Sequence, residues 1–160
     1  MTVIRLQHAQ SIVVGLSAAI VLAAPVALAQ TSVQAMFEKH KLLGTFAWDC
    51  SKPANKDNLY FVHRVLDANH VQRDQMSGES TRDLTVIIDK TTEAGPNQLA
   101  LSGTVSGVVG GRNLVNTPTD GVWRIEPNRI LRWEATVDGQ KLIANGKILR
   151  NGAQVPWDNR

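Results

Sequence analysis

The sequence contains a single cysteine, Cys50, and this scarcity limits how the chain can be held together. One cysteine cannot form a disulfide within the chain, so an apolar core has to stabilise the fold in place of cross-links. Free cysteines are often buried as small apolar side chains, and we expect the same of Cys50. The alternative is an intermolecular disulfide or a reactive thiol.

Neither sign of charge dominates the chain, and this bears on its partners. The 160 residues include 17 Lys and Arg against 14 Asp and Glu, a net charge of +3 with neutral histidine. These charges are spread evenly, without the clustered basic patch that is typical of nucleic-acid binding. We therefore expect no nucleic-acid partner.

Long apolar runs are absent after the first 29 residues. Arg5 precedes an uncharged apolar stretch at 12–24, and residues 27–29 (Ala-Leu-Ala) supply the small side chains that signal peptidases recognise. At about 1.5 Å per residue, this stretch is shorter than the roughly 30 Å hydrocarbon core of a membrane. The sequence predicts a cleaved signal peptide over 1–29, a periplasmic or secreted location, and a single mature domain over 30–160 without a transmembrane segment.

Motifs for catalysis, metal binding and phosphate binding are lacking as well. Neither a G-x-S-x-G nucleophile elbow nor a phosphate-binding loop ending in Lys-Ser/Thr occurs. The histidines outside the signal peptide, His40, His63 and His70, lack the spacing of a metal site. A two-residue turn before His70 would place His63 opposite Asp74 and allow a catalytic pair, whereas a three-residue turn would place it opposite Arg73. Apart from that pair, we expect no enzymatic activity, no metal and no cofactor.

A period-two alternation of apolar and polar residues runs through most of the remaining chain. It starts after Gly44 and is clearest at 131–137, where Leu, Trp, Ala and Val alternate with Arg, Glu and Thr. Such alternation is typical of strands with one buried face. A short helical pattern precedes it over 31–43, with Ser32 as N-cap and an apolar stripe that we expect to dock on the sheet as a lid.

Turn residues divide the alternating part into about eight strands. Asp138-Gly139 is a strong signal for a two-residue hairpin, and the glycines at 107–111 indicate a bend or a mobile loop. Short connections favour a mainly β, antiparallel meander, since parallel pairs need crossover helices. Eight strands suit a closed barrel, although a two-sheet sandwich has the same alternation. The expected strands are 45–50, 59–66, 70–76, 83–88, 99–105, 122–126, 131–137 and 141–150.

Aromatic residues make up only 5% of the chain, yet several fall on the apolar faces of expected strands. Trp48, Trp123 and Trp133 share this placement. Their indoles either fill the core or line a cavity for a flat or acyl ligand. The candidate ligand-binding residues are Trp48, Phe61, His63, Trp123 and Trp133.

The segment 44–48 (Gly-Thr-Phe-Ala-Trp) resembles the start of a lipocalin barrel, in which a helical turn precedes a G-x-W motif on the first strand. Phe46 stands at the family's tryptophan position, and Trp48 follows two residues later on the same face. The family's tryptophan packs beneath an arginine of the last strand, which Arg150 matches in position. The segment is also similar to the start of small secreted bacterial proteins of unassigned function. The lipocalin resemblance implies a cup-shaped barrel that binds an apolar ligand.

These features favour a non-enzymatic extracytoplasmic binding protein, expected to be a monomer, that holds a small apolar ligand in a β barrel. One alternative is a secreted protein-interaction module, such as an inhibitor of a cell-wall hydrolase, that presents the loop at 107–113. Another is that the sequence assigns no function. Arg64, Arg73 and Arg82 would form either a basic strip for an acidic partner or a solvated face.

Overall fold

The computed structural model describes residues 31–109, 111–127, 129–150 and 153–155. The predicted signal peptide, the expected turn at Asn151 and the role expected for the Arg150 side chain lie outside what is described. No helix in the described ranges is long and apolar enough to cross a bilayer. In chain order the elements are α1 (Val33–Lys39), β1 (Gly44–Ala47), β2 (Tyr60–Asp67), β3 (His70–Met76), β4 (Arg82–Gly95), β5 (Gln98–Val109), β6 (Arg112–Glu126), β7 (Arg129–Val137), β8 (Gln140–Ala144), β9 (Lys147–Arg150) and β10 (Ala153–Val155).

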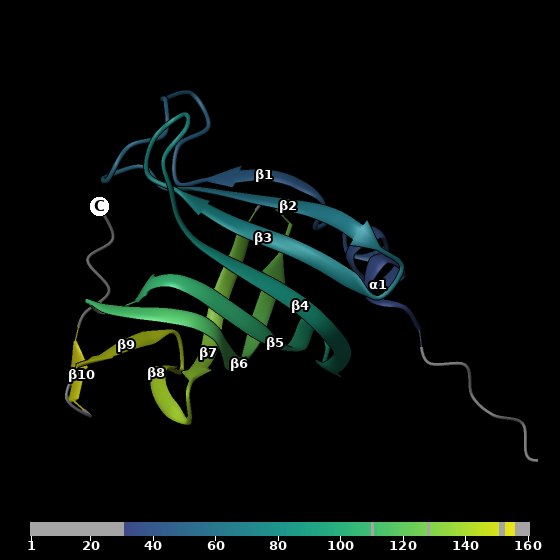
Figure 1. Cartoon of the computed structure of the whole chain (residues 1–160). Helices are drawn as coiled ribbons and strands as arrows, with labels where there is room; N and C mark the ends of the chain where they lie inside the picture. Colours follow the sequence, from purple (N-terminus) through teal and green to yellow (C-terminus); the bar gives the residue numbers. More distant parts are fainter. Residues whose placement is uncertain (1–30, 110, 128, 151–152, 156–160) are drawn as a thin grey trace, which may run out of the picture.

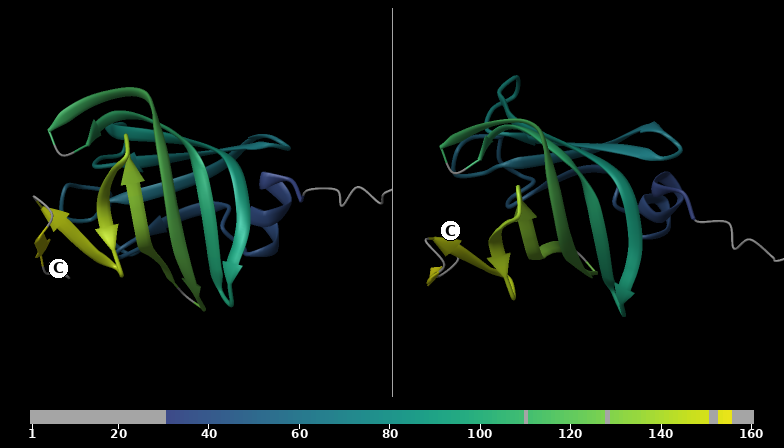
Figure 2. Two further views of the ribbon diagram at one scale, coloured as in Figure 1. Left: turned by 90° about the horizontal axis from the view of Figure 1, so that it is seen from below. Right: turned by 60° about the horizontal axis from the view of Figure 1, so that its bottom comes forward.

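The ten strands form one antiparallel sheet in chain order, each strand pairing with the next. The predicted β meander with one short N-terminal helix is therefore confirmed. The sheet curls so that β1–β3 pass over β5–β7, and β4 runs from one part to the other (Figures 1 and 2). Within the described strands, β1 and β10 do not pair with each other. The expectation of a closed barrel of about eight strands is therefore not confirmed. The described strands form one curled, open sheet of ten strands.

A hairpin at Asn145 and Gly146 accounts for one of the additional strands. Both residues adopt positive φ angles, 52° and 73°, and split the strand expected at 141–150 into β8 and β9. This left-handed conformation is the one that Asn-Gly pairs adopt in tight hairpins. The predicted hairpin at Asp138-Gly139 has the same geometry, with φ angles of 53° and 71°, and is confirmed.

The central strands β4, β5 and β6 are longer than the sequence pattern indicates, because bulges bend them without ending them. The register of β4 shifts between Ile88 and Lys90, where β5 presents Gly103 and Ser102. A Cβ atom at Gly103 would clash with the carbonyl oxygen of Ile87. The two backbones approach this closely only because residue 103 has no side chain.

Helix α1 covers one end of the curled sheet, as the sequence predicts. The Ser32 side chain caps the helix by accepting a hydrogen bond of 3.1 Å from the backbone N–H of Ala35. Phe37 is fully buried and lies edge-on to His63 of β2 and Trp123 of β6, so it joins the two halves of the sheet. The buried residues of this core are Val33, Met36, Phe37, Leu42, Val71, Ile88, Leu99, Leu101 and Trp123.

The first strand ends at Ala47, and this reverses two predictions. Trp48 is 51% exposed and Cys50 is also exposed, so neither side chain faces the core. In the loop that follows, the Asn58 side chain makes two reciprocal hydrogen bonds of 3.0 Å with the backbone of Asp49. Such side-chain bonds offer the backbone an alternative to the sheet ladder, which explains the early end of β1.

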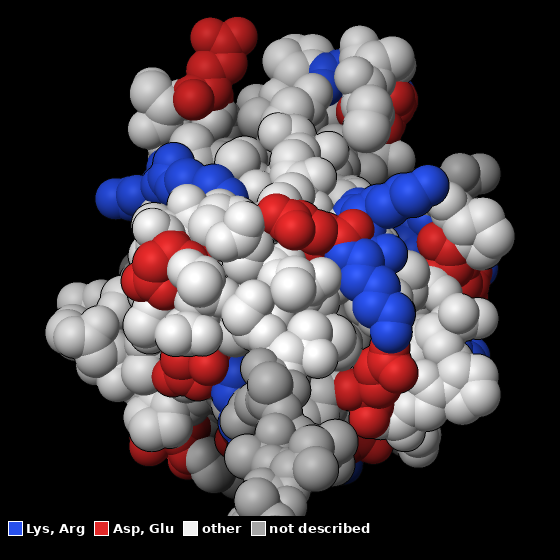
Figure 3. All heavy atoms as spheres, turned by 90° about the vertical axis from the view of Figure 1, so that its right-hand side faces the viewer, with Lys and Arg blue, Asp and Glu red and all other residues white. Residues whose placement is uncertain are grey.

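Charges of both signs are interspersed on the face of the molecule shown in Figure 3. Between α1 and β4, the Lys39 Nζ atom lies 2.6 Å from Glu93 Oε1. Exposed pairs of this kind contribute little to stability. They leave this face without a patch of one sign.

Candidate ligand site

Stacked aromatic rings fill the interior between β2 and β6. The Trp123 indole is 6% exposed and stacks on the His63 imidazole, with ring centroids 5.3 Å apart and ring planes inclined by 20°. The Phe46 ring of β1 lies 5.1 Å from His63 on a tilted plane. Two predicted ligand-binding residues, His63 and Trp123, therefore lie together in the interior. The first strand contributes Phe46 to this group in place of Trp48.

The buried His63 imidazole is neutral. Its Nδ1 atom donates a hydrogen bond of 2.6 Å to the carbonyl oxygen of Leu42, and its buried Nε2 atom has no hydrogen-bond partner among the described residues. Burial and the neighbouring Arg73 cation lower the pKa of His63 from 6.5 to about 4, against the opposing effect of the Leu42 bond. Only one of its nitrogens carries a proton at neutral pH.

The β2–β3 register decides between the two arrangements that the sequence allows for His63. His63 lies opposite Arg73, not opposite Asp74. Because successive side chains alternate, Asp74 lies on the outer face of the sheet, where Arg64 Nη2 is 2.6 Å from its Oδ2 and Arg82 Nη1 is 3.8 Å from its Oδ1. The prediction of a His63–Asp74 catalytic pair is therefore wrong. The predicted strip of Arg64, Arg73 and Arg82 is wrong as well, because Arg73 faces the interior while the other two lie beside Asp74 on the outer face.

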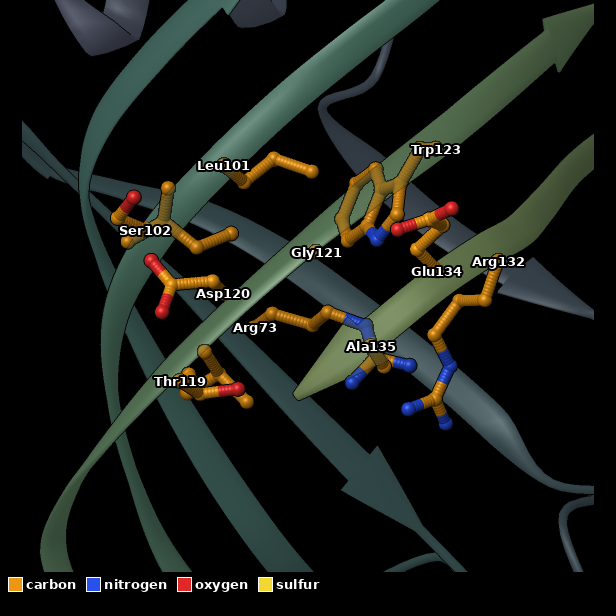
Figure 4. A pocket seen from close by; sticks show the side chains of 12 residues that line it. Arg73, Leu101, Ser102, Thr119, Asp120, Gly121, Trp123, Arg132, Glu134 and Ala135 are labelled. Atoms are coloured by element: carbon orange, nitrogen blue, oxygen red, sulfur yellow. The ribbon is translucent and has the colours of Figure 1, made fainter. Parts of the chain in front are cut away.

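Arg73 points into the interior, into the pocket that Trp123 also lines (Figure 4). The residue is 5% exposed, and its guanidinium carbon lies 4.4 Å from the ring centroid of Phe61 and 5.9 Å from that of Trp123. The predicted ligand-binding residue Phe61 is thus the platform on which the cation rests. The Arg73 side chain forms no ion pair and no hydrogen bond with the residues that the structure describes.

A bulge in β7 brings a second arginine to the same place. The register between β6 and β7 shifts at Trp123, which pairs with Arg132 and leaves Trp133 as the extra residue. A bulge reverses the alternation of side chains, so Arg132 faces the pocket. Trp133 is turned to the outer face, where the Arg124 guanidinium stacks on its ring at 4.3 Å. The prediction that Trp133 faces the interior is wrong for this reason.

Arg73 and Arg132 share one pocket on the inner side of β3–β7 (Figure 4). The pocket has a volume of about 60 Å³ and is partly open to solvent. Typical small-molecule pockets have roughly 300–1,000 Å³, so this one admits a small group or one end of a ligand. Apart from the arginines and Trp123, its walls include the apolar Val86, Ile88, Leu101 and Ala135 and the hydroxyl-bearing Ser102 and Thr119.

Two cations share this pocket without a carboxylate between them. Burial and the charge of Arg132 lower the pKa of Arg73 well below its usual value, and burial lowers the pKa of Arg132. Glu134 and Asp120 also line the pocket, but Glu134 Oε2 pairs with Lys141 Nζ at 3.1 Å. Within the described part of the chain, neither carboxylate forms an ion pair with either arginine.

From the sequence, Arg73 was expected on a surface strip with Arg64 and Arg82, and Arg132 had no expected role, so neither was expected in the ligand site. Arg73 is in phase with Val71, which is fully buried, so the alternation along β3 could have indicated its inward direction. Arg132 carries no such signal, because its direction follows from the bulge, and the bulge depends on how β7 pairs with β6. Pairing between strands is not visible in one sequence.

The pocket offers guanidinium donors, aromatic faces and an apolar wall, which are groups capable of hydrogen bonding and of apolar contact. Among the residues placed by the structure, no group of three or more His, Cys, Asp or Glu is arranged to hold a metal ion. No protein-family model matches the chain, and no curated protein or solved structure is significantly similar to it.

Proposed function

We propose that the mature chain is an extracytoplasmic, non-enzymatic binding protein that holds a small, largely apolar ligand in the cup of the curled sheet. One observation carries this proposal: apolar side chains, the Trp123 indole and two guanidinium groups face a single pocket. The signal-peptide pattern at 1–29 supports the location. The lipocalin resemblance at 44–48 and the curl of the sheet support a barrel-like cup, whose end strands do not pair.

The size of the pocket limits the ligand. A volume of about 60 Å³ accommodates a few heavy atoms, so the ligand is small, or its remainder extends through the open side of the pocket. Contact with Val86, Ile88 and Leu101 favours an apolar body, because burial contributes about 25 cal/mol per Å² of apolar surface. This is a narrower ligand class than the fatty acids or sterols that a hollow barrel would admit.

Tryptophan fluorescence tests the proposal directly. The triple variant Trp48→Phe/Trp133→Phe/Trp157→Phe leaves Trp123, which lines the pocket, as the one tryptophan that reports binding. We expect quenching or a blue shift when short-chain alcohols, short-chain acids and substituted benzenes are titrated. Adding Trp123→Phe to this variant should abolish the response. A flat titration with every compound would contradict the proposal.

The β5–β6 hairpin favours the protein-interaction alternative as a second candidate function. Val108 and Val115 are 58% and 73% exposed, close to the point where Gly107 bends β5 with a φ angle of 125°. Exposed apolar side chains of this kind are common at protein contacts.

If the hairpin blocks a cell-wall hydrolase, the wild-type protein should slow peptidoglycan hydrolysis by a purified lysozyme-type enzyme. Val108→Ser/Val115→Ser should relieve that inhibition, whereas Trp123→Phe should retain it. An unchanged rate with the wild type contradicts this alternative.

A further inference from the structure

We propose that the ligand is a small organic acid whose anionic oxygen group, a carboxylate or a phosphate, binds between Arg73 and Arg132 beneath Trp123. This inference rests on the proposed function and narrows it from apolar molecules in general to acids with an apolar body. It assigns the guanidinium groups the task of recognising the charge, and the apolar wall the task of holding the body.

The first argument is the burial of Arg73 without a counter-ion. Arginines are almost never fully buried unless they are paired, because an unpaired charge is costly to remove from water. Arg73 is 5% exposed, and among the described residues its guanidinium interacts with the rings of Phe61 and Trp123 and with no carboxylate. A ring face accepts no more than part of the five N–H groups of a guanidinium, so N–H groups of Arg73 remain available for an oxygen acceptor.

The second argument is a contrast between the two sides of the sheet. On the outer side, the chain supplies carboxylates to its arginines, and Asp74 accepts a bond from Arg64 only one residue along β3 from Arg73. In the pocket, two arginines are neighbours and lack a carboxylate partner among the residues described. A bound anion would relieve the repulsion between them and form charge-assisted hydrogen bonds with both. The arginines paired with carboxylates are Arg64, Arg82, Arg112 and Arg129.

The third argument concerns the rest of the ligand. Besides the arginines and the polar residues already named, among them Asp120 and the Lys141-paired Glu134, the pocket presents an apolar wall. Its members are Val86, Ile88, Leu101 and Ala135. An inorganic anion would leave these side chains in contact with water, whereas an acid with a short hydrocarbon body would cover them. The pocket therefore favours an organic acid over a free inorganic ion.

Isothermal titration calorimetry with a matched set of six-carbon compounds tests the inference. Hexanoate and hexan-1-ol have the same body and differ in charge, while hexyl phosphate presents the alternative acidic group. We expect at least one of the two acids to bind about tenfold or more tightly than the alcohol. The stronger acid then identifies which oxygen group the arginines prefer.

Variants locate the binding site. Arg73→Met and Arg132→Met should each weaken binding of the preferred acid by about tenfold or more and leave binding of hexan-1-ol within about twofold. Arg64→Met removes the same charge from the outer face of the neighbouring strand and should leave both affinities unchanged. Arg73→Lys should recover part of the affinity, because it keeps the charge and loses the planar fork.

Urea denaturation separates a binding role from a structural one. Without ligand, Arg73→Met should unfold at a higher urea concentration than the wild type, since it removes a buried, repelled charge and keeps an apolar side chain against Phe61. A lower midpoint together with unchanged affinity for the acid would make Arg73 a structural residue and overturn the inference.

The outcomes distinguish the two proposals. Equal affinity for hexan-1-ol and the acids, unaffected by Arg73→Met, would overturn the anionic group and leave the proposed function in place. Acetate or inorganic phosphate binding as tightly as hexanoate, with the same loss in Arg73→Met, would support the anion site and contradict an apolar body. If the alcohol, both acids, acetate and phosphate all fail to bind, both proposals fall.

Discussion

Arg73 and Asp74 are neighbours in the sequence, yet they lie in opposite environments because strand β3 alternates its side chains. Asp74 is on the outer face with Arg64, and Arg73 is in the pocket on Phe61. A shift of one residue in the register would exchange the two. The phase of β3 is set by the buried Val71, and this much could be inferred from the sequence.

The tryptophans show where inference from single residues stops. Trp123 is buried as alternation predicts, but Trp133 is turned outward by a bulge and Trp48 follows the end of a strand. Both departures arise from contacts with other segments: Trp133 depends on pairing with β6, and Trp48 precedes a loop held by Asn58. The period-two pattern therefore located strands reliably and individual side chains less so.

The neutral His63 makes stability depend on pH. Its pKa is about 4 in the folded chain against an ordinary 6.5, so between these values the unfolded chain binds a proton that the folded chain excludes. The free energy of unfolding therefore falls as the pH is lowered from about 6.5 to about 4, by about 3 kcal/mol. Urea denaturation at about pH 7 and about pH 4 measures this loss.

The variant His63→Gln supplies the control for this pH dependence. It keeps a hydrogen-bond donor and does not titrate, so the part of the loss between about pH 6.5 and about pH 4 should disappear. The pKa values of three carboxyl groups, Asp49, Asp67 and Glu93, are also lowered in the folded chain. The stability that these carboxylates contribute is lost as they protonate, which happens near pH 4 and below. An equal loss in wild type and variant would show that His63 is not the group responsible.

At the scale of elements, turns and bulges decided what the sequence could predict. The Asp138-Gly139 hairpin was expected and occurs, whereas the hairpin at Asn145-Gly146, which has an equally strong local signal, was not predicted. The bulge opposite Gly103 is different, because it shows only once β4 and β5 are paired. Local turn chemistry can thus be inferred from one sequence, whereas a bend shared by two strands cannot.

The close approach at Gly103 leads to a stability prediction. Gly103→Ala would place a Cβ atom against the carbonyl oxygen of Ile87 and force β4 and β5 apart. We expect a loss of about 1–3 kcal/mol in the free energy of unfolding, measured by urea denaturation. Thr104→Ala, one residue further along β5, serves as the matched control because it only shortens an existing side chain. Equal effects of the two changes would argue against the close approach.

At the scale of the whole molecule, Phe37 connects parts of the chain that the sheet leaves apart. From helix α1, its ring contacts His63 on β2 and Trp123 on β6, with centroid distances of 5.8 and 6.0 Å. The sequence predicted a docked helix from the apolar stripe at 31–43. It did not predict that this contact would join the two halves of an unclosed sheet.

Removing this contact should be costly. Phe37→Ala deletes a fully buried ring, and we expect a loss of about 3–5 kcal/mol in the free energy of unfolding. Thermal or urea denaturation measures the effect, with Lys39→Ala on the exposed side of the same helix as control. A loss below about 1 kcal/mol would mean that the helix does not hold the two halves together.

The unpaired ends of the sheet have a consequence for the stability of the pocket's walls. Strand β1 has four residues and β10 has three, and no described ladder joins them. Because these two edge strands are not paired with each other, the distance between them can change through the twist of the sheet without breaking a hydrogen bond between neighbouring strands. The walls of the pocket come from β3–β7, so such an adjustment at the edges would leave the strand pairs around the pocket intact.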